Sequence, residues 1–195
     1  EPGAAFAYNG GLPPVLAARH GASIRCEEPI LRWEPAADGV KVITTKGEYH
    51  AAQLILSAGS WINSLTPDLN LPLVVERQVL FWFEPKPSPT LFYPERCPIH
   101  LWQFDGHQFF YGFPDLGEGV KVACHHAGES ATPNSIRREV AAHEVEAMRT
   151  IVRRFLPAAN GRLRSAEVCM YTNTPDEHFW IDWHPRCPQV LVASP

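Results

Sequence analysis

The sequence lacks any apolar run that approaches the roughly 20 residues needed to cross a lipid bilayer. Its first residues, Glu1-Pro2-Gly3, also lack the basic start and apolar core of a secretory signal peptide. Basic residues are not in excess, because 17 Lys and Arg stand against 21 Asp and Glu, for a formal net charge of −4. Since a nucleic-acid-binding surface usually needs a basic excess, we expect neither a nucleic acid nor a membrane as a partner.

Cysteine is scarce, with five scattered residues and therefore an odd number. No disulfide framework is evident from this pattern, and the default location is a reducing cytoplasm. His178, His184 and Cys187 are possible metal ligands, at spacings of six and three. Zinc sites favour tighter ligand pairs and a suitable fourth ligand, so we predict no metal site; metal analysis of the purified protein would test the alternative.

What the chain does contain is a succession of short apolar stretches separated by turn signals. Leu54-Ile55-Leu56 is fully apolar, as is typical of a strand buried inside an α/β sheet. The stretches that follow Pro72 are typical of an antiparallel sheet with one solvated face. We predict strands at 22–33, 40–44, 48–50, 54–56, 74–83, 99–104, 108–113, 119–125, 163–171, 179–182 and 190–193.

One long helix is predicted, opened by Thr132-Pro133-Asn134 and closed by Pro157. Its apolar residues recur at steps of three and four and would form one buried stripe of Ala141, Val145, Met148, Val152 and Phe155. Shorter helices are expected at 15–20 and at 61–65, the latter with Ser60 as its N-cap.

Several motifs carry more information than the periodicity. They are Glu76-Arg77-Gln78-Val79; Tyr111-Gly112-Phe113-Pro114 followed by Lys121 and His125; Arg154-Phe155-Leu156-Pro157; and the run from Cys169 to Asp176, Cys-Met-Tyr-Thr-Asn-Thr-Pro-Asp. In this order they resemble motifs of the FAD-dependent amine oxidases of the sarcosine oxidase and N-methyltryptophan oxidase family. A single motif would be weak, but together they span nearly the whole chain.

The resemblance implies a two-domain architecture and an α+β fold class. A mainly antiparallel sheet, residues 70–165, would be the substrate domain of a flavin oxidase. Residues 1–69 and 166–195 would be pieces of the FAD/NAD-type α/β domain.

The resemblance also implies the reaction, in which FAD oxidises a secondary amine or N-methyl amino acid and dioxygen is reduced to hydrogen peroxide. Cys169 would be the covalent anchor of the flavin, with Met170 and Tyr171 beside the cofactor. Without its flanking residues, Cys169 would fit a buried free thiol in a strand better than a flavin anchor.

Lys121 and His125 are separated by an even number of positions on one strand, so both side chains point to the same face of the sheet. The resemblance places Lys121 beside the flavin, where its charge would assist oxygen reduction. It places the Tyr111 hydroxyl near the substrate carboxylate and gives His125 a catalytic role. From the pattern alone, Lys121 and His125 could equally be solvent-facing, and Tyr111 could be a core aromatic.

Further FAD contacts are implied upstream. Ser57-Ala58-Gly59 resembles the strand-end turn that passes close to FAD, with Trp61 behind it, and Ile24 lies on the strand expected near the adenine. An ordinary strand-to-helix turn would also need a small residue such as Gly59.

The chain also departs from the family pattern. No GxGxxG run stands at the head of a strand–turn–helix, so the cradle for the cofactor pyrophosphate is missing. Both ends read as cut, and we expect the isolated chain to be inactive. The alternative function is a non-catalytic ligand- or partner-binding fragment derived from such an oxidase.

Overall fold

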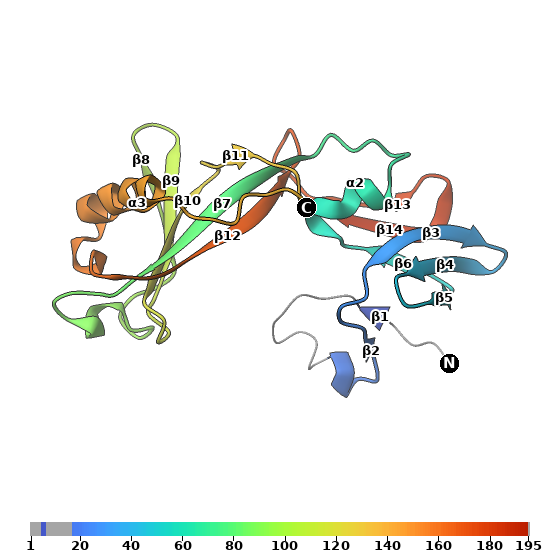
Figure 1. The fold of residues 1–195 in the computed structure, drawn as a ribbon, viewed down its shortest axis with the longest axis horizontal. Coiled ribbons are helices and arrows are strands. Elements are labelled where there is room, and N and C mark those ends of the chain that lie inside the picture. Colours follow the sequence, from blue (N-terminus) through green and yellow to red (C-terminus); the bar gives the residue numbers. More distant parts are fainter. Residues whose placement is uncertain (1–4, 7–16, 195) are drawn as a thin grey trace. The chain divides into compact units, whose positions relative to one another are not determined.

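The structure is a computed structural model that describes residues 5–6 and 17–194 (Figure 1). It divides into two compact units, one from the described parts of Glu1–Leu71 and Phe179–Pro195 and one from Pro72–His178. The expected boundary at residue 166 differs from the observed one. Strand β12 (Leu163–Asn173) pairs along its length with β7 (Val74–Phe83), so residues 166–178 stay with the sheet of the second unit.

The first unit contains two three-stranded sheets and one short pair of strands. An antiparallel meander is formed by β3 (Ile30–Ala36), β4 (Gly39–Thr44) and β5 (Glu48–Ala51). The other sheet has the order β13-β14-β6, in which β6 (Leu54–Leu56) runs parallel to β14 (Cys187–Ser194) and β13 (Trp180–His184) is antiparallel to it. The short parallel pair is β1 (Ala5–Phe6) with β2 (Ser23–Ile24).

The prediction of one continuous strand at 22–33 is wrong. The segment is split into β2 and β3, and Glu27 between them has a φ of 53°, in the left-handed region that interrupts an extended strand. Ser60 does not act as an N-cap but lies within a 3-10 turn, Gly59–Trp61, that precedes α2 (Ile62–Leu65). Of the helix expected at 15–20, residues 17–19 are helical and residues 15–16 lie outside the described residues.

The second unit is built on one six-stranded sheet in which every pairing is antiparallel. Strand β7 is central: β12 pairs with it along one edge, and β10 (Val120–His125) and β11 (Glu129–Ser130) follow one another along the other edge. Strand β10 continues outward to β9 (Gln108–Phe113) and β8 (His100–Phe104). The mixed, mainly antiparallel α+β class predicted from the sequence is confirmed.

Helix α3 (Ala142–Phe155) packs on one face of this sheet. Its buried residues Met148 and Val152 join a core that includes Phe81, Phe83 and Phe110. Burial of several such apolar side chains, at about 1.5–3 kcal/mol each, supplies much of the stabilisation of the unit. No helix in the described part of the chain is long and apolar enough to cross a membrane.

The start of the long helix was predicted too early. Residues 131–141 are non-helical, and α3 begins only at Ala142, where the Glu144 carboxylate accepts a hydrogen bond from the Ala141 amide at 2.8 Å. The carbonyl groups of Arg137 and Glu139, which a helix would use internally, instead accept hydrogen bonds from the buried Arg77 guanidinium of β7, at 2.7 and 2.9 Å. A long-range contact therefore overrides the local helical pattern.

Acid should weaken this part of the fold. Burial pushes the pKa of Glu144 upward, but hydrogen bonds from Arg137, Arg77 and the Ala141 amide outweigh it and lower the pKa to about 2. A carboxyl group whose pKa is depressed on folding stabilises the folded state above its unfolded pKa, and this contribution fades as the pH falls toward its folded pKa. We expect the urea concentration at the unfolding midpoint to be lower at pH 2.5 than at pH 5. In Glu144→Gln the same change of pH should lower it much less. Equal acid sensitivity in both proteins would contradict this.

Candidate functional site

The register of the second sheet places the predicted catalytic side chains on one face. Lys121 stands opposite Trp82 and Phe113, and Ala123 stands opposite Tyr111. Because directly paired residues of antiparallel strands point to the same side, this face also carries His125, Cys169 and Tyr171. We call this surface, defined by Trp82, Tyr111, Lys121, His125, Cys169 and Tyr171, the Lys121 face; α3 packs on the other face.

Lys121 lies between two aromatic rings. Its ammonium nitrogen is 5.3 Å from the centroid of Trp82 and 5.0 Å from that of Phe113, within the range of cation–π attraction. Within the described residues, no carboxylate lies within 4.0 Å of this nitrogen. The side chain is half-buried, so its charge is held on the face rather than extended into solvent.

Three side chains of the same face lie against one another. The hydroxyl oxygen of Tyr171 lies 3.2 Å from His125 Nδ1, and the ring of Tyr111 packs edge to face against that of His125, with centroids 6.3 Å apart. The rings of His125 and Tyr171 pack edge to face, with centroids 5.5 Å apart. Side chains from β9, β10 and β12 thus lie together on this face.

Burial shifts the titration of these groups in the direction that keeps them neutral. It raises the pKa of Tyr111, with a further rise from the hydrogen bond to Tyr171, and it raises the pKa of Tyr171. Burial also lowers the pKa of His125, and the neighbouring His126 lowers it further. The result is a set of neutral hydrogen-bonding groups beside the positively charged Lys121.

Cys169 lies on β12 opposite Gln78 of β7, on the Lys121 face. Burial raises the pKa of its thiol, while the positive charges of Lys121 and Arg138 act in the opposite direction. Met170, which the sequence grouped with Cys169, stands opposite Arg77, so its side chain points to the face that α3 packs on. The register therefore separates Met170 from the other predicted cofactor contacts of this strand.

One carboxylate on the Lys121 face was given no role by the sequence patterns. Glu76 stands opposite Tyr171, and its side chain is only 12% exposed. It accepts hydrogen bonds from Gln78, from the amide of Gly128 and from Asn173, at 2.7, 2.7 and 2.8 Å. Only tertiary contacts reveal this residue, because its donors are spread over three parts of the chain.

The remaining predicted cofactor residues belong to the first unit. Ser57 directly follows β6, and Ala58 and Gly59 begin the 3-10 turn. Gly59 has a φ of 50°, in the left-handed region, and in the described part of the chain no atom beyond its sequence neighbours lies within 4 Å of the position a Cβ would take. Trp61 is 38% exposed, and Ile24 is half-buried in β2. The turn is thus an open one that a side chain larger than hydrogen would strain.

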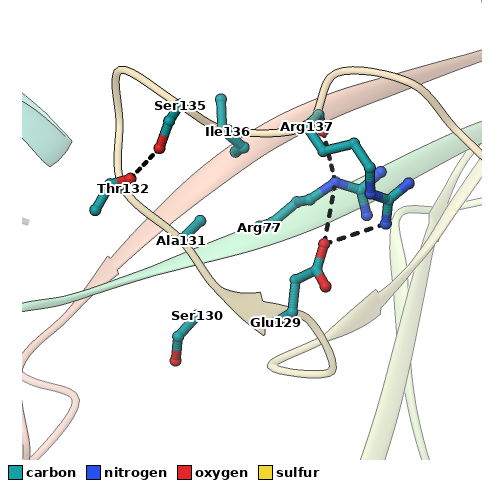
Figure 2. A pocket seen from close by; sticks show the side chains of 8 residues that line it. All are labelled: Arg77, Glu129, Ser130, Ala131, Thr132, Ser135, Ile136 and Arg137. Atoms are coloured by element: carbon teal, nitrogen blue, oxygen red, sulfur yellow. Dashed lines mark hydrogen bonds and ion pairs between the residues drawn. The ribbon is translucent and has the colours of Figure 1, made fainter.

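Two cavities of about 450 Å³ each are lined by none of the residues that define the Lys121 face. One, in the second unit, is bordered by Glu129, Arg137 and hydroxyl residues of the segment after β11, and Figure 2 shows that its charged groups already pair with one another. The other, in the first unit, is lined by residues that include Trp33, Asp68 and His184. Within the described residues no group of three or more His, Cys, Asp and Glu is arranged to hold a metal ion.

Comparison with known proteins gives a consistent result. The profile of the family described as FAD dependent oxidoreductase matches residues 15–194. The chain is 44% identical over 182 residues to the monomeric sarcosine oxidase of Streptomyces avermitilis, covering 92% of this chain and 47% of that protein. It is 30% identical over 181 residues to the N-methyl-L-tryptophan oxidase of Salmonella heidelberg, with the same coverage of each chain. The chain therefore spans about half the length of these relatives.

A solved structure shares the fold. The glycine oxidase of Geobacillus kaustophilus superposes with a TM-score of 0.73 over 91% of this chain and 45% of that one. The identity is 17%, so this likeness concerns the fold alone.

Proposed function

Because the chain belongs to the FAD-dependent oxidoreductase family, we propose that the protein oxidises a small secondary amine or N-methyl amino acid with FAD and dioxygen, giving hydrogen peroxide. One observation carries this proposal: the family's sheet holds an ammonium group, Lys121, on a half-buried aromatic face beside Cys169, Tyr111, Tyr171 and His125. The alternative of a non-catalytic binding fragment is not favoured, since the relatives are named as oxidases.

The residues present fit a flavin. Trp82, Phe113 and the two tyrosines give an aromatic surface against which a planar ring system can lie. Cys169 presents a thiol on this surface, and the open Gly59 turn allows close approach to backbone amides. When bound, FAD would supply the two-electron oxidation, in which the substrate loses a hydride equivalent from the carbon next to its nitrogen and a proton from the nitrogen, giving an imine.

The protein's own groups would then orient the reactants and stabilise charge. Lys121 would hold a fixed positive charge where negative charge develops on oxygen. The Tyr111 hydroxyl would bind the substrate carboxylate. The neutral imidazole of His125, held by Tyr171, would hydrogen-bond the substrate without adding a second positive charge.

We further propose that Cys169 would form a thioether to the flavin 8-methyl carbon. The S–H bond and one methyl C–H bond would break, and the two electrons released would pass through the flavin to dioxygen, the acceptor of the proposed reaction. The expected result is that the flavin of the intact protein remains with the polypeptide after acid precipitation, and that Cys169→Ala releases it completely. Cys124→Ala is the matched control, because this cysteine lies on β10 on the face that α3 packs on and should not affect retention. Peptide mapping that finds an unmodified Cys169 thiol in active, flavin-loaded enzyme would refute the linkage.

A further inference from the structure

Glu76 accepts three hydrogen bonds on the Lys121 face. Two of its partners lie at the ends of strands of the site: Gly128 follows β10, and Asn173 is the last residue of β12. Oε1 accepts from Gln78 and from the amide of Gly128, and Oε2 accepts from Asn173. The imidazole of His126 lies 3.5 Å from Oε2. One side chain of β7 therefore holds the turn that follows His125 and the end of the strand that carries Tyr171.

The turn after His125 is not held by local preferences. His126 has a φ of 50°, a conformation that non-glycine residues adopt only when surrounding contacts enforce it. Gly128 approaches β7 so closely that a Cβ would lie 1.7 Å from the Arg77 carbonyl oxygen. The Gly128 amide donates a hydrogen bond to the Glu76 carboxylate. This contact holds Gly128 close to β7 on the side of the Lys121 face.

We propose that Glu76 is a positioning residue of the candidate active site, which holds His125 against Tyr171 by fixing the 126–128 turn and the end of β12. The proposal deepens the proposed function and rests on it for the role of His125. Glu76 does not contact the reacting atoms; it acts through the backbone on either side of the hydrogen-bonded pair.

The charge of Glu76 has a second consequence for His125. Burial and His126 disfavour the protonated imidazole, whereas Glu76 and Glu177 raise the pKa of His125. The titratable side chains that face His125 are Tyr111 from β9, His126 from β10, Tyr171 from β12, Glu76 from β7, and Glu177 from the segment after β12. Removing the charge of Glu76 should therefore lower the titration midpoint of His125.

The test uses the 195-residue chain and NMR, without flavin. In Glu76→Gln we expect exchange of the Gly128 amide to accelerate about tenfold, because a hydrogen bond to a charged acceptor becomes a bond to a neutral one. We also expect the titration midpoint of His125 to fall, because the Glu76 charge that raises its pKa is removed. Glu167→Gln, which removes an exposed carboxylate from β12 on the same face, is the matched control and should change neither value.

Glu76→Asp separates position from charge. Aspartate keeps the negative charge but is too short to reach both Gly128 and Asn173. Exchange of the Gly128 amide should therefore accelerate, while the titration midpoint of His125 should change less than in Glu76→Gln. Unchanged Gly128 exchange in Glu76→Gln, or loss of the whole folded sheet rather than a local effect, would overturn the proposal. Because the readout needs no flavin, its failure would leave the Cys169 test, and with it the proposed function, unaffected.

Discussion

Replacing Lys121 by methionine in the intact, flavin-loaded protein is expected to slow reoxidation of the reduced flavin by dioxygen about 10²–10³-fold, the usual cost of losing one preorganised electrostatic group. Methionine keeps the length and apolar stem of lysine but removes the charge that lies over Trp82 and Phe113. Anaerobic reduction by the substrate should change far less, because that step places no negative charge on oxygen.

Stopped-flow measurement of the two half-reactions decides the matter. Lys86→Met is the matched control, since Lys86 is an exposed lysine of the same unit and its replacement should leave both rates unchanged. Equal slowing of both steps in Lys121→Met would indicate a displaced flavin, and the role in oxygen reduction would have to be abandoned.

Replacing Arg77 by leucine should destabilise the second unit by about 3–5 kcal/mol, the typical effect of removing one partner of a buried ion pair. Arg77 is 3% exposed, and its guanidinium bonds to Glu144 Oε1 at 2.6 Å and to the carbonyl groups of Arg137 and Glu139. Leucine would leave the Glu144 carboxylate and both carbonyl groups without this partner. Urea unfolding followed by circular dichroism measures the change.

Arg162→Met provides the comparison for this stability measurement. Arg162 also pairs with a carboxylate, that of Glu84 at 3.1 Å, but its side chain is 73% exposed. Exposed ion pairs contribute about 0–1 kcal/mol, so this variant should unfold close to wild type. If Arg77→Leu also unfolded at the wild-type midpoint, the Arg77–Glu144 contact could not be what holds the segment after β11 in place.

The sequence predicted the elements whose signals are local. The alternation around Lys121 and His125 required that the two side chains share one face, because the period of a strand is two. The strand at 74–83 and the apolar stripe with Met148 and Val152 appear in the structure for the same reason. The order of motifs from Glu76 to Asp176 indicated the family, since a run of spaced motifs is more specific than any single one.

Tertiary structure decided what depends on residues far apart in the chain. The pairing of β12 with β7 kept residues 163–173 in the second unit, placed Cys169 and Tyr171 on the face of Lys121 and turned the Met170 side chain away from it. The buried Arg77 guanidinium delayed the start of α3. In each case a contact across many residues outweighed a local preference worth a few tenths of a kcal/mol per residue, and a periodic pattern along the chain carries no information about such contacts.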